Sequence, residues 1–210
     1  MSTYTEIQTD VISWLNRSGF TALTDEVETL IALAQRRVWR TSDLNAMLTE
    51  VSFLMSAPTI PADYLRTKSM TFLKGSAVME VNGAPLKKVL QAGTLDTPRL
   101  YAPVGTEFKF GPTTDADYTI DLIYYAALPV VSTTVATNWL SDNAPEIILF
   151  GAVMEACLWL KDDQRAAIWE GRFGQTLGDL MGSEGKMGYE GGSLQVTTDT
   201  HNGIDSTRLN

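Results

Sequence analysis

Apolar side chains recur at helical spacing near the beginning of the chain. Ile7, Val11 and Leu15 fall at every fourth position, so they share one face of a helix predicted over residues 3–17. The Ser18-Gly19 pair that follows is typical of a helix end. The segment therefore predicts an amphipathic helix that offers one face to a core.

The next segment repeats this periodicity over a longer stretch. Thr24 is the expected N-cap of a second helix, because Asp25 and Glu26 follow it in the first turn, where negative charge complements the helix dipole. Apolar residues then recur from Val27 to Val38 at alternating spacings of three and four. The first part of the chain thus predicts a pair of helices.

From about residue 48 the apolar spacing changes from helical to alternating, which is typical of β-strands. Strands are predicted over residues 51–55, 67–73, 107–110 and 118–125. The clearest hairpin signal is Asn82-Gly83, which would join a strand at 77–81 to one at 84–89 through a two-residue turn. Pro85 donates no ladder hydrogen bond, so the second of these strands should lie at a sheet edge.

Helical periodicity returns at Ala144. Pro145 suits the first turn of a helix that extends to about residue 160. Asp162 is a plausible N-cap for another helix that extends to about Met181. Because the break between the two is short, they are expected to form an antiparallel pair.

These elements predict an α+β fold in which helices from both ends of the chain pack together. The expected helical core comprises residues 1–47 and 138–182, and a small antiparallel β domain is inserted at 48–137. Residues 183–210 are expected to form an extended C-terminal tail. This tail is rich in glycine and polar residues, so it cannot bury enough apolar surface to fold alone.

Composition narrows the class of protein. The chain has 210 residues, of which 44% are hydrophobic, enough for an ordinary core, and its net charge is −9. Sequence-independent DNA binding needs Lys and Arg at the phosphates, so this charge argues against a stand-alone nucleic-acid binder. It is compatible with a conduit whose acidic wall does not hold DNA. No apolar run is suited to crossing a membrane, and the N-terminus lacks the features of an export signal.

Chemically active side chains are sparse. The only histidine, His201, lies in the polar tail, and the only cysteine, Cys157, lies in an apolar helical run where an inert buried thiol is expected. Asp115 and Asp117 are interpreted as a turn ahead of a strand rather than as metal ligands. The glycine-rich residues 182–188 follow a helix and lack the Ser or Thr of a phosphate loop. No catalytic residue, cofactor or metal is therefore predicted.

Candidate partner-binding residues fall in two places. In the helical part, they lie at the arginine-rich end of the second predicted helix, where a tryptophan could be interfacial. These are Arg36, Trp39 and Arg40. In the tail, they are the apolar and aromatic residues of a segment that needs a partner to become ordered. These are Tyr189, Leu194, Val196, Ile204 and Leu209.

An ordered series of segments resembles the head-to-tail adaptor family of tailed bacteriophages. The likeness lies in residues 4–7, 14–18, 30–37, 60–65, 98–101, 108–112, 117–125, 138–146 and 160–163. No one of these segments is diagnostic by its chemistry, and the likeness rests on their order across residues 4–180. The stretches at 75–97 and beyond 182 are less typical of the family.

The resemblance implies a virion protein of the neck or tail, assembled in the host cytoplasm. Such adaptors form a ring, here expected to be a dodecamer, that docks on the portal protein after DNA packaging and offers a platform for the tail or nozzle protein. DNA would pass through the ring without specific binding. The helices would carry most of the contact around the ring. The tail would reach the portal or an adjacent subunit and could add a strand to an open sheet edge.

Two alternatives stay open from the sequence. The nearer one is another neck or tail structural subunit, such as a tail-completion or nozzle protein, which would differ by not touching the portal directly. The more distant one is a phage-associated hydrolase with its two acidic residues scattered across the β region.

Overall fold

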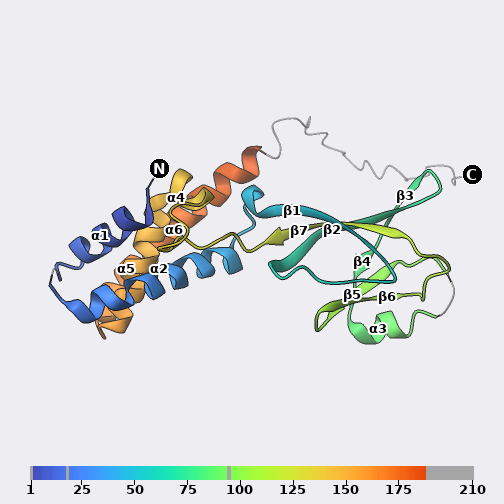
Figure 1. Ribbon diagram of the computed structural model, residues 1–210, viewed down its shortest axis with the longest axis horizontal. Coiled ribbons are helices and arrows are strands. Elements are labelled where there is room, and N and C mark those ends of the chain that lie inside the picture. The colour runs from blue at the N-terminus through green and yellow to red at the C-terminus, as the bar shows by residue number, and fades with distance from the viewer. Residues whose placement is uncertain (1, 18, 94–95, 188–210) are drawn as a thin grey trace, which may run out of the picture.

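The computed structural model describes residues 2–17, 19–93 and 96–187, and these form an elongated molecule with helices at one end and strands at the other (Figure 1). The helices are α1 (Tyr4–Trp14), α2 (Thr21–Thr41), α3 (Leu86–Leu90), α4 (Trp139–Asn143), α5 (Pro145–Trp159) and α6 (Asp163–Met187), with a 3-10 turn η1 at Asn45–Met47. The strands are β1 (Leu48–Leu54), β2 (Tyr64–Lys74), β3 (Ala77–Glu80), β4 (Asn82–Gly83), β5 (Leu100–Val104), β6 (Glu107–Gly111) and β7 (Thr119–Ala126). The predicted α+β class is confirmed.

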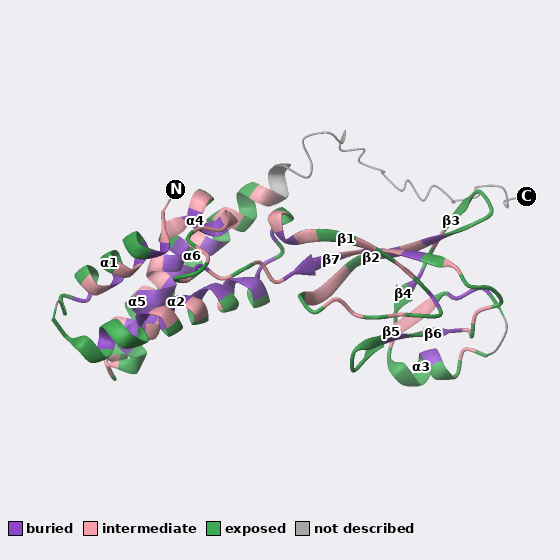
Figure 2. Ribbon diagram, in the orientation of Figure 1, coloured by how far each residue is buried: buried purple, intermediate pink, exposed green. Residues whose placement is uncertain are grey.

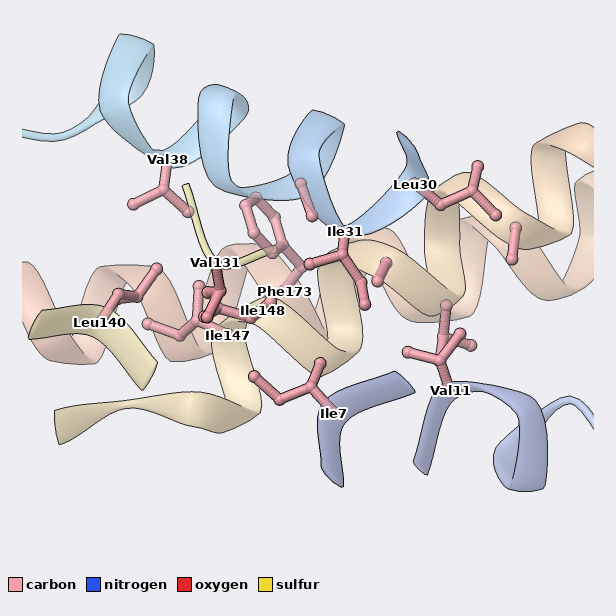
Figure 3. Packing of buried hydrophobic residues seen from close by; sticks show 14 of the residues in the cluster. Ile7, Val11, Leu30, Ile31, Val38, Val131, Leu140, Ile147, Ile148 and Phe173 are labelled. Carbon is pink, nitrogen blue, oxygen red and sulfur yellow. The ribbon is translucent and has the colours of Figure 1, made fainter. Parts of the chain in front are cut away.

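Helix α5 forms the centre of the helical half, because it is apolar on nearly all sides and packs against α1, α2, α4 and α6. Ile147 and Ile148 are fully buried between residues of α1, α2 and α6 (Figure 3). Burial is concentrated on the inward faces of the surrounding helices, and their outer faces are exposed (Figure 2). One core is thus built from segments at opposite ends of the sequence.

The ends of α2 and α6 show how well capping residues in the sequence predict where a helix begins and ends. Asp162 precedes α6, and its Oδ1 accepts a hydrogen bond from Arg165 N at 3.2 Å, as predicted for an N-cap. The predicted start at Thr24 is wrong: α2 begins at Thr21, and the Thr24 hydroxyl donates to Phe20 O. Helix α6 extends to Met187, so residues 183–187, expected in the tail, are helical.

The β half contains two sheets that enclose a second core. The first is antiparallel, with strand order β1-β7-β2-β3, and the second has the order β4-β5-β6. Phe108 of β6 lies between them, with its ring centroid 5.6–5.9 Å from those of Phe53, Tyr64 and Tyr101. The two cores are distinct clusters, one among the helices and one between the sheets.

The predicted hairpin at Asn82-Gly83 is wrong. The turn lies earlier, at Gly75, whose positive φ of 65° suits a left-handed turn position, and it joins β2 to β3. Asn82 and Gly83 instead form β4, which pairs in parallel with β5, a strand not predicted. Residues 84–89 do not form a strand, because the chain turns into α3 and buries Val89 against the second sheet.

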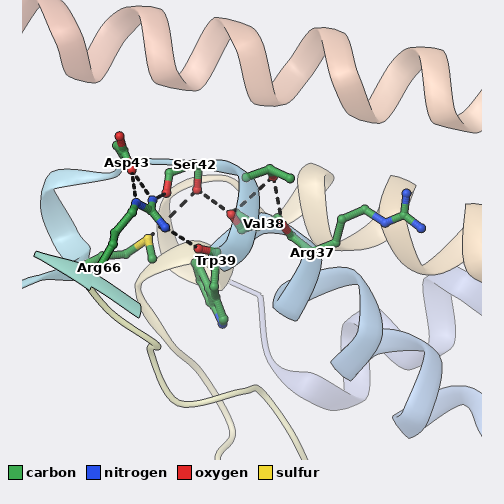
Figure 4. Close-up of polar contacts among 8 residues, drawn as sticks. Arg37, Val38, Trp39, Ser42, Asp43 and Arg66 are labelled. Carbon is green, nitrogen blue, oxygen red and sulfur yellow. Dashed lines mark hydrogen bonds and ion pairs between the residues drawn. The ribbon is translucent and has the colours of Figure 1, made fainter. Parts of the chain in front are cut away.

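Arg66 of β2 joins the β half to the helical half (Figure 4). Its guanidinium donates to Trp39 O at 3.3 Å and to Ser42 O, at the C-terminal end of α2, and pairs with the Asp43 carboxylate. It also lies over the Tyr125 ring, 4.7 Å from the centroid. A cation at a helix C-terminus satisfies carbonyls that lack an intrahelical partner. Arg66 therefore fixes the end of α2 against the first sheet.

Gln35 fixes the chain where it returns from the sheets to the helices. Its side chain is buried, and its Oε1 accepts hydrogen bonds from Val131 N at 3.0 Å and from Asn138 Nδ2 at 2.7 Å. Asn138 in turn caps α4 in a reciprocal capping box with Ser141. One buried amide thus connects α2 with the segment that leads into α4.

Candidate assembly surfaces

The described part of the chain contains no group of three or more His, Cys, Asp or Glu residues that could hold a metal ion. Cys157 is fully buried, and burial raises the pKa of its thiol, as expected for an inert side chain. None of the helices described combines the length and the apolar character needed to span a membrane. Exposed side chains and an open sheet edge are the candidate features that the described residues offer.

Asp115 and Asp117 stabilise a turn, as predicted. Asp115 accepts hydrogen bonds from Lys74 Nζ at 3.1 Å and from the Tyr118 hydroxyl at 3.0 Å, and its pKa is lowered mainly by the Lys74 contact. Asp117 accepts from the backbone N and the hydroxyl of Ser56 at 2.9 and 2.8 Å. Both carboxylates are engaged with the ends of strands.

The exposed face of α2 carries opposite charges at its two ends. Asp25 and Glu26 are exposed in the N-terminal half, and Arg36 and Arg40 are exposed in the C-terminal half. Neither arginine forms an ion pair with any residue that the structure describes. This face, with exposed Leu33 between the charges, is suited to a partner of mixed charge.

Trp39 is not on that face. The prediction that its side chain contacts a partner directly is therefore wrong for the folded chain. Its side chain is 2% exposed and packs in the helical core. The helical period explains the difference. Trp39 lies on the buried side of α2 with Val38 and with Gln35, four positions before it, whereas Arg36 and Arg40, also four positions apart, lie together where the helix surface turns to solvent. The arginines remain candidates, and the tryptophan contributes to stability.

An aromatic patch formed by Trp14, Phe150 and Trp169 lies at the surface of the helical half. The ring centroids are 5.4–5.8 Å apart, and Trp14 is 43% exposed. The Arg172 guanidinium lies 5.0 Å from the centroid of Trp169. Half-exposed tryptophan next to arginine is the composition favoured at protein interfaces. The sequence placed Trp14 and Trp169 on apolar helix faces and did not identify this patch.

The outer edge of β1 is a surface of a different kind. β1 pairs with β7 on one side, and no other strand of the described ranges lies on its other side. Val51 and Phe53 pack against the β core but stay half-buried, and Leu54 is exposed. The sequence could not show this edge, because strand order depends on contacts between distant segments.

The remaining predicted contacts lie outside the described residues. These are Tyr189, Leu194, Val196, Ile204 and Leu209, together with His201. The tail leaves from the end of α6, which is held to η1: Asn45 N donates to Glu184 Oε2 at 2.9 Å. The root of the tail is therefore close to the start of β1.

The chain matches a family model along most of its length. The model of a family described as SU10 adaptor protein matches residues 2–196. The match covers the helices, both sheets and the stretch at 75–97, and it includes Leu194 and Val196 of the tail. No curated protein matches the chain significantly.

Proposed function

We propose, since this chain belongs to the SU10 adaptor protein family, that it is a structural subunit joining the head of a tailed phage to its tail. That family is one of phage head-tail adaptors, and membership confirms the resemblance noted in the sequence. The observation that carries the proposal is the family match over residues 2–196, which spans both halves of the fold.

The chain assembles into a ring, most simply a dodecamer, beneath the portal protein and above a tail or nozzle protein. Ring closure requires head-to-tail contacts in which one surface of a subunit meets a different surface of the next. The aromatic patch and the charged face of α2 are the surfaces offered for this purpose in the helical half. The tail beyond Met187 makes a further contact with the portal or with the adjacent subunit.

The ring lies in the virion neck after assembly in the host cytoplasm, and DNA leaves the head through its centre. The net charge of −9 supports a channel wall that is acidic and does not hold the phosphate backbone. The chain acts without a cofactor and without a catalytic site. A reconstruction with lysine and arginine lining the channel would contradict this part of the proposal.

Binding to the portal tests the proposal most directly. The purified chain is mixed with portal rings of the same phage, and native mass measurement and electron microscopy determine how many copies bind and where. We expect a ring with the symmetry of the portal, although the chain alone can be a monomer. Binding to a tail protein without any portal contact would instead identify a tail-completion or nozzle subunit.

Removal of the tail tests its share in that contact. A chain ending after Gly182 should bind portal rings more weakly than the full chain, because twelve weak tail contacts act together in one ring. A chain that keeps residues 183–187, and with them the last turn of α6, separates the loss of the tail from damage to the helix. Unchanged binding by both truncations would exclude the tail as a portal or subunit contact.

A further inference from the structure

The edges of the two sheets differ in how well they are covered. A loop covers the outer edge of β6, because Phe108 N donates to Pro58 O at 2.8 Å and Ile60 N donates to Thr106 O at 2.9 Å. β3 has four residues and β4 has two, so each offers a short edge. β1 has seven residues, and its outer edge carries no strand within the described ranges. It is the longest open edge there.

The backbone of β1 is oriented to accept another strand. Met55 N donates to Tyr118 O at 2.9 Å, and the register with β7 is unbroken from Leu48 to Leu54. In an antiparallel pair, successive residues point their N–H and C=O groups alternately toward the partner and away from it. Glu50 and Ser52 therefore direct these groups outward, and no backbone group of the described residues bonds to them.

The side chains of β1 do little to discourage pairing. Exposed edge strands are commonly protected by lysine, proline, a bulge or a covering loop. β1 has no lysine, proline or bulge, and Glu50 is its only charged residue. Val51 and Phe53 face the β core but remain half-buried, so a strand added beside them would complete their burial.

Residues 193–198 of the tail fit this edge. Their sequence, Ser-Leu-Gln-Val-Thr-Thr, alternates the apolar Leu194 and Val196 with polar residues, which is the pattern of a strand with one buried face. The segment carries no charge and so does not repel Glu50. It lies outside the described residues, although the family match extends to Val196.

Chain length indicates that the tail of one copy reaches β1 of another. The sheet is antiparallel throughout, and β1 starts beside the end of α6 and leads away from it. To pair antiparallel with its own β1, the tail would have to reach the far end of that strand first and then turn back. A seven-residue strand is about 20 Å long. Residues 188–192, fully extended, span about 20 Å at most, which leaves no residues for the turn.

We propose that residues 193–198 of one copy add an antiparallel strand to β1 of the next copy, with Leu194 and Val196 covering Val51 and Phe53. This inference rests on the proposed ring, and it names the tail's partner as the adjacent subunit rather than the portal. Backbone hydrogen bonds to an open edge give affinity, and the alternating side chains give the register. Each copy donates one strand and accepts one, which is the head-to-tail relation that closes a ring.

Proline substitution in the full chain tests the contact from both sides. Glu50→Pro removes an outward N–H without removing a bond between β1 and β7, and Glu50→Ala is its matched control. In the tail, Gln195→Pro combined with Val196→Pro removes the backbone N–H groups that would point to either edge of the added strand, and Ser206→Pro is the control. Ring assembly on portal rings, followed by sedimentation and native mass, should weaken at least tenfold in both test variants and stay unchanged in both controls. The tail variants remain informative even if Glu50→Pro fails to fold.

Cross-linking distinguishes the source of the strand. Glu50→Cys chains are mixed with Gln195→Cys chains on portal rings and treated with a short thiol-reactive cross-linker, and the unmixed chains measure the background from buried Cys157. A covalent product of two chains is expected only in the mixture. A chain carrying both substitutions that links mainly within itself would overturn the inference. If the wild type and all proline variants form rings equally well, the strand-exchange inference is wrong and the proposed function stands. If the wild type does not bind the portal at all, the proposed function is wrong.

Discussion

The helical half and the β half are assembled from the sequence in different ways. The β half comes from one continuous segment, whereas the helical half combines α1 and α2 with α4, α5 and α6 from the far end of the chain. The first strand of the insertion pairs with the last, and Leu48 lies opposite Tyr125. The insertion therefore enters and leaves the helical half at adjacent positions. Without that pairing, closing a loop of this length would cost about 4 kcal/mol of entropy, so the order of the helical core depends on the folding of the sheet.

The substitution with the largest expected effect on stability is Phe108→Ala, which removes the central ring of the β core and so tests this dependence. A buried Phe→Ala change costs about 3–5 kcal/mol, and Phe108 contacts three other rings. All five tryptophans lie in the helical half, so their fluorescence reports on that half alone. We expect the fluorescence transition in denaturant to shift together with the circular dichroism. A fluorescence midpoint that stays at the wild-type value would show that the halves are independent.

Gln35→Met tests the connection between the halves from the helical side. Val131 N and Asn138 Nδ2 would lose their shared buried acceptor. Asn138 is half-buried and keeps its hydrogen bond to Pro129 O, so Val131 N is the buried donor left unsatisfied. Such a donor costs about 1–3 kcal/mol, and the free energy of unfolding should fall by about that amount. Gln175→Met, on the exposed face of α6, is the control and should change it little. Equal stability of the two variants in urea would contradict a connecting role for Gln35.

Two glycine substitutions should act in opposite directions within the helical half. A Cβ at Gly151 would lie 2.8 Å from Ala34 Cβ and 3.2 Å from the Phe173 ring, so Gly151→Ala should destabilise the chain by about 1–3 kcal/mol. A Cβ at Gly178 would meet nothing within 4 Å, and Gly178→Ala should stabilise α6 by about 1 kcal/mol through helix propensity. Thermal unfolding of both variants measures the difference. If both substitutions raised the melting temperature, the close approach of α2 and α5 at Gly151 would be absent in solution.

The smallest expected effect is on the pH dependence of the β half. Burial, followed by the hydrogen bond that Tyr124 donates to Asp63, raises the pKa of Tyr124 to about 12. An unfolded tyrosine has a pKa of about 10, so this stabilisation is complete below about pH 10 and is lost as the pH rises to about 12. Melting temperature should fall less steeply over that range in Tyr124→Phe than in the wild type. If the melting temperatures of the two proteins fell in parallel with pH, Tyr124 would make no contribution to the pH dependence of stability.

The sequence predicted the helical half better than the β half, for a reason visible in single residues. Ile7, Val11 and Pro145 report their structure through neighbours within one or two turns. Asn82-Gly83 has the local signature of a hairpin, but pairing of Asn82 with Leu100 and burial of Val89 decide its conformation instead. Trp39 and Arg40 are adjacent in sequence, and a rotation of about 100° around α2 separates a core residue from a surface candidate.

By itself, the sequence determined the α+β class, the positions of the long helices and the adaptor family, because these depend on local periodicity or on an ordered series of segments. The tertiary structure alone decided the order of the strands, the roles of Arg66 and Gln35, the exposure of the aromatic patch and the open edge of β1. Each of these depends on which distant segments lie side by side. That choice is made by burial and backbone pairing over the whole chain, and no short stretch of residues contains it.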